Sequence, residues 1–191
     1  MKAFVGELIG TFVLTLFGCG SVVVAVLFGE YGSIFQIALV WGIGVTLAIY
    51  LTRHLSCAHL NPAVTVAMVL SKRMKADKLL SYLLAQFAGA FLAGAVLYGL
   101  LAPTISAYEL AEKYGVKMQQ IALAWEWARG VTSPIVGATK TQYLDDAAGA
   151  LAVRLTAEDV AYLEEPYLPH RIVGAIDRNP ADGVVLLDEK K

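Results

Sequence analysis

Three long apolar runs dominate the N-terminal half of the chain. Residues 3–29 carry one charged side chain, Glu7, and residues 31–52 and 79–102 carry none. A helix needs about 20 consecutive apolar residues to cross the hydrocarbon core of a bilayer. The pattern therefore predicts three membrane-spanning helices, and so an all-α membrane protein in this half.

A shorter apolar segment lies between the second and third runs. Asn61 stands directly before Pro62, and residues 64–70 are almost entirely apolar. Proline fits the first turn of a helix, and asparagine is a good N-cap. A helix this short cannot span, and irregular backbone at membrane depth must be buried in protein or line a cavity. The segment predicts a re-entrant half-helix, whose positive end and asparagine amide could form part of a pore.

The pattern changes at Pro103, which is expected to end the third span. Helical periodicity is found over residues 107–114, 117–129, 141–153 and 156–165, and residues 132–138 are typical of a short buried strand. Thr156 and Asp159 have the spacing of a capping box at the start of the last helix. This half is therefore expected to be a soluble α/β segment.

The distribution of charge supports this division. Residues 1–102 hold six Lys/Arg and three Asp/Glu, and residues 103–191 hold nine and thirteen, so that net charges of +3 and −4 give the total of −1. Neither half is basic enough to indicate a nucleic-acid partner. Cys19 and Cys57 are expected to be free and to pack as small apolar side chains. No metal site is expected, because no ligand-type side chains have the required spacing around His59.

The basic residues of the first half also predict orientation. All of them fall on one side of the membrane if the three spans alternate: Lys2, Arg53, Lys72, Arg73, Lys75 and Lys78. By the positive-inside rule that side is cytoplasmic. We expect a multi-pass protein of the cell (plasma or inner) membrane with a cytoplasmic N-terminus, a half-helix that enters from the cytoplasm, and residues 103–191 outside.

Three side chains within the apolar runs invite a functional interpretation. Glu7 either lies at the membrane interface or contacts a partner, because a carboxylate inside the membrane is costly. His59 either packs as a core residue or supports the half-helix. Trp41 lies in the middle of its apolar run and not at its edge, which argues against an ordinary interfacial tryptophan.

Small residues recur at intervals of four and predict close helix contacts. The pairs are Gly6 and Gly10, Gly89 and Ala93, and Ala90 and Gly94. Small side chains at this spacing let membrane helices approach closely. The alternative is the general enrichment of glycine and alanine in membrane helices.

Four motifs of the first half occur in this order in one family: Gly6–Phe12, Trp41–Val45, Ala58–Thr65 and Ala85–Ala90. With them, residues 1–101 resemble the first half of a major intrinsic protein (aquaporin), in its glycerol-facilitator branch. The resemblance implies a single repeat of three spans and one half-helix, with glycerol, a small polyol or water as permeant. The implied pore-lining residues are Trp41, Asn61, Pro62 and Ala63. The implied pore-supporting residues are Glu7 and His59.

Residues 102–191 resemble the C-terminal end of an aldo-keto reductase. The resemblance is carried by Ile121–Trp125, Gly130–Lys140 and Leu155–Asp159. It implies an incomplete fragment of a (β/α)8 barrel, with Gly137, Thr139 and Lys140 as the remnant of an NADP site. The catalytic residues of that family come from earlier strands, which this chain does not contain. We therefore expect no catalytic residues, no bound cofactor and no enzymatic activity.

The leading hypothesis combines these halves. It describes a glycerol-facilitator-type channel chain, truncated within its first repeat and joined near Leu101 to the reductase-like fragment, with domains 1–101 and 102–191. One alternative is a membrane-anchored remnant of an NADP-dependent aldo-keto reductase, and another is a half-channel that forms a pore as a homo-oligomer in the lipid bilayer. A second Asn-Pro-Ala, at residues 179–181, is interpreted as a coincidence within a polar tail.

Overall fold

The computed structural model describes residues 1–29 and 33–167, and every residue in these ranges belongs to a helix or a loop. The helices are α1 (Lys2–Phe28), α2 (Ile34–Thr52), α3 (Pro62–Leu70), η1 (Ala76–Lys78), α4 (Leu79–Tyr114), α5 (Met118–Ala128), α6 (Thr141–Gly149), η2 (Ala150–Ala152) and α7 (Ala157–Glu164). The second Asn-Pro-Ala, residues 179–181, lies outside the described residues.

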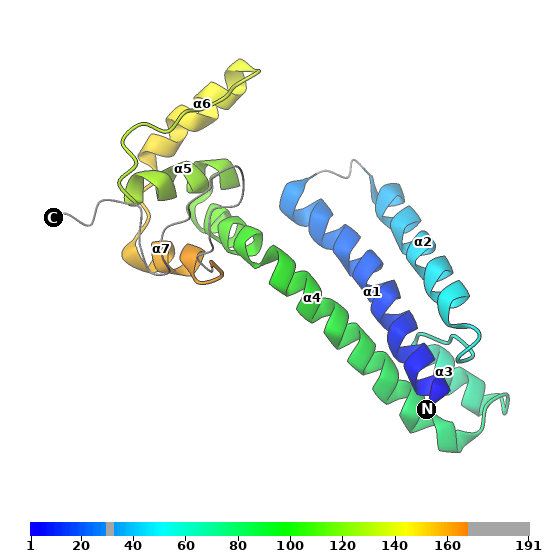
Figure 1. The fold of residues 1–191 in the computed structure, drawn as a ribbon. Helices are drawn as coiled ribbons and strands as arrows, with labels where there is room; N and C mark the ends of the chain where they lie inside the picture. The colour runs from blue at the N-terminus through cyan, green and yellow to red at the C-terminus, as the bar shows by residue number, and fades with distance from the viewer. Residues whose placement is uncertain (30–32, 168–191) are drawn as a thin grey trace, which may run out of the picture.

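Helices α1, α2, α3 and α4 form a bundle in which α1 packs against both α2 and α4 (Figure 1). The N-terminus, α3 and the start of α4 lie together at one end of this bundle. Helices α1, α2 and α4 are each long and apolar enough to cross a bilayer. The three predicted spans are therefore confirmed as helices of sufficient length and apolarity. The short helix predicted between the second and the third is confirmed as α3.

Glycines bring α1 close to α4 and to the loop before α3. A Cβ atom on Gly89 would lie 2.3 Å from the backbone oxygen of Leu8, and one on Gly10 would lie 2.3 Å from a methyl group of Leu60. No larger residue fits there without movement of the backbone or of its neighbour. The predicted close approach is thus confirmed at these glycines. The close contact predicted at Gly94 is wrong, because a Cβ atom on this residue would meet open space.

Helix α4 does not end at Pro103, contrary to the sequence-based prediction. It continues for 36 residues to Tyr114, with the proline inside it. Proline removes one helical hydrogen bond, but it does not forbid a helix whose flanking residues favour that structure. At 1.5 Å per residue α4 is about 54 Å long, well beyond the ~30 Å hydrocarbon core. Its C-terminal part therefore extends out of the membrane.

A small helical cluster packs around the protruding end of α4. Its core comprises Leu110 and Ala111 of α4, Ile121 and Ala124 of α5, and Val153. The predicted helices that correspond to α5, α6 and α7 are confirmed within a few residues at their ends. In Figure 1, α6 extends away from the membrane-spanning helices.

The strand predicted over residues 132–138 is wrong, because this segment is an exposed loop. A strand needs a neighbouring strand to pair its backbone groups, and the described residues contain none. The expected (β/α)8 fragment therefore finds no support in the described part of the chain.

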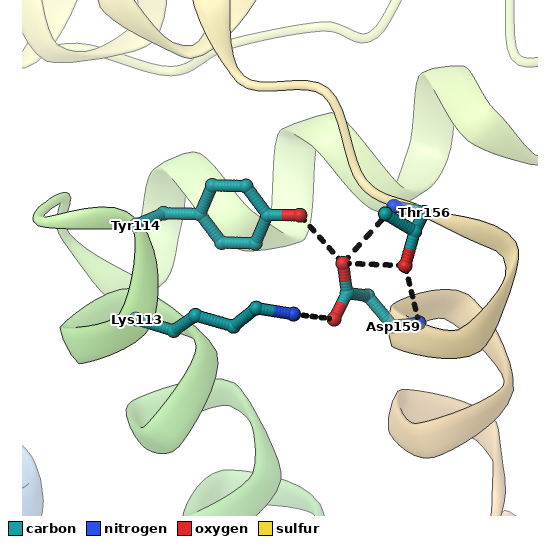
Figure 2. Close-up of polar contacts among 4 residues, drawn as sticks. All are labelled: Lys113, Tyr114, Thr156 and Asp159. Carbon is teal, nitrogen blue, oxygen red and sulfur yellow. Dashed lines mark hydrogen bonds and ion pairs between the residues drawn. The ribbon is translucent and has the colours of Figure 1, made fainter.

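A polar cluster joins the end of α4 to α7 (Figure 2). Lys113 Nζ lies 2.6 Å from one oxygen of Asp159, and the hydroxyl of Tyr114 donates to the other. The hydroxyl and backbone N–H of Thr156 also donate to Asp159, while Asp159 N–H donates to the Thr156 hydroxyl, which completes the predicted capping box. Burial alone would raise the pKa of Asp159, but hydrogen bonds from Lys113, Tyr114 and Thr156 outweigh it and hold the pKa well below its usual value.

Candidate functional site

The loop between α2 and α3 has an unusual backbone. Ala58 and Leu60 both lie in the left-handed region, with φ of 48° and 53°. This conformation costs about 1–2 kcal/mol for a residue with a Cβ atom. It turns the N–H groups of His59 and Leu60 towards α1, so contacts with α1 must compensate the strain.

Glu7 of α1 supplies those contacts. Its side chain is fully buried. One carboxylate oxygen accepts from His59 N at 3.0 Å, and the other accepts from Leu60 N at 2.8 Å. Gln86 of α4 donates a third hydrogen bond, at 2.8 Å. No Lys or Arg within residues 1–29 and 33–167 pairs with this carboxylate, so amide donors alone satisfy it and Glu7 ties the loop to both neighbouring helices.

Gln86 also connects this carboxylate to the half-helix. Its Nε2 donates to the hydroxyl of Thr65 at 2.8 Å, and that hydroxyl donates to the carbonyl of Asn61 at 3.1 Å. The Nδ1 atom of His59 lies 3.2 Å from the same hydroxyl. A Thr65 hydroxyl that donates to this carbonyl can only accept from His59, and that arrangement uses a ring protonated on Nδ1. The other ring nitrogen, Nε2, is buried and has no hydrogen-bond partner among the described residues.

The half-helix α3 begins as the sequence predicts. Asn61 has an extended backbone, and its Oδ1 accepts from the N–H of Ala63 at 2.8 Å, with Pro62 as the first helical residue. Since the oxygen is occupied by the cap, the amide NH2 points away from the helix. Asn61 is exposed in the described structure. An amide donor and the positive end of a helix therefore face the same space.

The structure brings together most, but not all, of the residues that the sequence suggested. Glu7, His59 and Asn61 belong to one hydrogen-bonded unit with the start of α3, where Pro62 is half-buried and Ala63 exposed. Trp41 lies elsewhere, on α2. A Cβ atom on Gly18 of α1 would lie 2.5 Å from its ring, so Trp41 packs closely over that glycine.

Gln86 and Thr65 also belong to this unit, although neither was predicted as a site residue from the sequence. Both are almost fully buried and bridge α3 to α4. Gln86 carried a usable signal, since it is the one amide side chain in a run without charges. Thr65 follows Asn61 by four residues, the spacing at which a hydroxyl reaches back to a helical carbonyl.

The three residues proposed as a remnant cofactor site do not converge. Gly137, Thr139 and Lys140 are exposed in the loop before α6. Gly137 borders a shallow hollow together with Gln120 and Tyr143, but Thr139 and Lys140 do not. Within the described ranges no group of three or more His, Cys, Asp and Glu side chains could hold a metal ion.

Three helices apolar and long enough to span, with a short helix that a buried carboxylate holds at one end of the bundle, are typical of a multi-pass membrane protein. The family model for the major intrinsic proteins matches residues 1–138, and the chain belongs to this family. The match continues past Leu101, the residue at which the resemblance was expected to end.

Curated relatives agree with this assignment. The chain is 40% identical to the glycerol uptake facilitator protein of Haemophilus influenzae over 105 residues, which are 55% of this chain and 40% of that protein. It is 40% identical to the Pseudomonas aeruginosa glycerol uptake facilitator protein over 118 residues, 62% of this chain and 42% of the relative. The chain is 43% identical to the Escherichia coli protein of the same name over 96 residues, which are 50% of this chain and 34% of that protein. The chain thus spans about two fifths or less of each relative's length.

Proposed function

We propose that this chain forms one half of a membrane channel for glycerol, small polyols or water. The observation that carries the proposal is the buried Glu7 carboxylate, which holds the loop before α3 and so presents Asn61 at the start of the half-helix. The names of the curated relatives support glycerol as permeant. The reductase-like reading of residues 102–191 gains no support from the fold or the comparisons, and it plays no part in the proposal.

Asn61 has the chemistry that such a permeant requires. Water and polyol oxygens accept hydrogen bonds, and the Asn61 amide nitrogen donates them, next to the unpaired N–H groups of a helix N-terminus. A donor set of this kind orients a neutral hydroxylated molecule without binding it as tightly as a charge would. In this proposal Pro62 and Ala63 form the adjoining wall of the pathway.

Trp41 is proposed as the apolar side of the same pathway. It is half-buried against Gly18, so part of its ring surface stays available. The carbon skeleton of a polyol could lie along that surface while its hydroxyl groups face donors. Glu7 and His59 are proposed as supporting residues, which fix the backbone rather than contact the permeant.

The proposal includes a cytoplasmic N-terminus and assembly of copies into a complete pathway. The described residues contain one half-helix that begins with Asn-Pro-Ala. A pathway enclosed on all sides needs further helices, which a homo-oligomer would supply. Cross-linking in proteoliposomes would detect such an oligomer, and protease protection of an N-terminal tag would test the orientation.

Stopped-flow light scattering on proteoliposomes tests the transport proposal. The chain is expected to accelerate glycerol or water entry over empty liposomes, and Asn61→Asp should reduce this flux at least about tenfold, the effect of roughly 1.4 kcal/mol on the barrier. Aspartate preserves the helix cap but replaces the amide donor by a charge. Gln119→Glu makes the same amide-to-acid change at an exposed position of α5 and is the matched control. Flux equal to that of empty liposomes would contradict the proposal.

A further inference from the structure

One end of the helix bundle carries a rim of basic side chains without acidic partners. Its members are Lys2, Arg53, Lys72, Arg73, Lys75 and Lys78, all exposed. Figure 1 places the N-terminus, the end of α2 and the α3–α4 connection at this same end. The three ion pairs found among the described residues all lie in the segment from α4 to α7. Asp77 is the acidic residue within the α3–α4 connection, so the rim has a large excess of positive charge.

Four of these charges lie in a tightly built turn after α3. The N–H of Lys72 donates to the carbonyl of Val69 at 3.0 Å, and the N–H of Arg73 donates to that of Met68 at 2.9 Å. This pair of bonds is the Schellman arrangement, whose left-handed position usually holds glycine. Here that position is Lys72, with φ of 58°. The chain thus keeps a lysine where glycine would be less strained, and such an outlier supports a functional role.

Exposed leucines flank the basic turn. Leu70, the last residue of α3, is 78% exposed, and Leu80, near the start of α4, is 67% exposed. Leu70 ends the short helix α3, and Leu80 lies in the first turn of α4, a helix long and apolar enough to span, whereas the basic residues between them lie in the connection. The turn therefore offers positive charge with exposed apolar surface directly beside it.

We propose that the α3–α4 turn, residues 71–78, binds the headgroup of an anionic phospholipid. Lys72, Arg73, Lys75 and Lys78 surround the phosphate, and Leu70 and Leu80 lie along the acyl chains. Basic clusters next to a membrane span attract anionic lipids, and the attraction weakens within a Debye length. A soluble anion would use the charges but not the leucines, which is why a lipid fits this surface better.

Lipid retention by the intact chain tests this proposal. Native mass spectrometry of the chain, released from mixed phosphatidylglycerol and phosphatidylcholine nanodiscs, is expected to show phosphatidylglycerol bound in preference. The double variant Lys72→Gln/Arg73→Gln should lose that preference at least fivefold. The double variant Lys140→Gln/Arg154→Gln removes two exposed charges from the other end of the molecule and should leave the preference unchanged.

A third variant separates lipid binding from folding. Lys72→Gly relieves the left-handed strain and removes one charge, so the melting temperature should hold or rise while phosphatidylglycerol retention falls. Equal retention of the two lipids by the unchanged chain would overturn the proposal. Equal loss in both double variants would also overturn it, because it would show an effect of net charge alone. Displacement of the lipid by millimolar glycerol phosphate would show that the turn recognises a phosphate without its lipid.

Discussion

Glu7 is the residue on which the candidate site depends most. A buried carboxylate that accepts hydrogen bonds from two backbone N–H groups and one side-chain amide is satisfied without a cation. Such charge-assisted bonds are among the stronger ones in proteins. They compensate the left-handed backbone at Ala58 and Leu60.

Glu7→Gln tests this role at the residue scale. In this variant an amide NH2 group replaces one of the two carboxylate oxygens. The buried N–H groups that donate to that oxygen would then lose their acceptor. We expect a loss of about 1–3 kcal/mol in unfolding free energy and a matching fall in any measured flux. Glu112→Gln, on the exposed face of α4, is the matched control and should change neither quantity. Unchanged thermal stability in Glu7→Gln would rule out the supporting role.

The tautomer of His59 is a second prediction at this scale. We expect the Thr65 hydroxyl to donate to the Asn61 carbonyl, which leaves His59 Nδ1 as the donor to that hydroxyl. Long-range ¹H–¹⁵N correlation on the chain in nanodiscs, with labelled histidine, should show a protonated Nδ1 and a bare Nε2. Thr65→Val should abolish that preference. A ring protonated on Nε2 alone would show that the network is arranged differently.

At the scale of elements, the crossing of α1 and α4 rests on glycine rather than on large side chains. Gly89→Ala would place a Cβ atom 2.3 Å from the carbonyl oxygen of Leu8, so the two helices must separate. Overpacking of this kind costs about 1–3 kcal/mol. The matched control is Gly94→Ala on the same helix, where the new methyl group meets open space and helix propensity improves. Thermal melts in detergent should show a lower midpoint for the first variant and an equal or higher one for the second.

The contact between α4 and α7 is expected to weaken at low pH, because Asp159 accepts hydrogen bonds from Lys113 and Tyr114. The pKa of Asp159 in the folded chain lies below its ordinary value of about 4. Its contribution to stability is therefore complete at neutral pH and is lost as the pH falls below about 4 towards the folded pKa. Amide exchange in α7 should accelerate over that range. Asp159→Asn should abolish this step, whereas Asp145→Asn, in exposed α6, should retain it.

At the scale of the whole molecule, the sequence predicted the membrane part better than the part outside it. Apolar runs without charge and the Asn61-Pro62 cap are local signals, and they located every helix of the bundle. The partners of Glu7 were harder to predict, because Gln86 is far away in sequence and meets it only once α1 and α4 pack.

The errors outside the membrane have physical causes as well. Pro103 is a weak helix terminator when both flanks favour helix, and α4 continues through it. The segment over residues 132–138 has strand composition, but a strand forms only with a partner, which composition cannot supply. The division into domains 1–101 and 102–191 stays a prediction, and the continuous helix α4 crosses that boundary.

We propose that Glu7 holds the start of α3 inside the bilayer, and the depth of α3 tests this role directly. A nitroxide on Ala63→Cys, with Cys19 and Cys57 replaced by serine, would report the depth of that position by electron paramagnetic resonance in lipid. We expect a depth within the hydrocarbon core in the otherwise unchanged chain and a shift towards the headgroups in Glu7→Gln. A label at headgroup depth in both chains would contradict it.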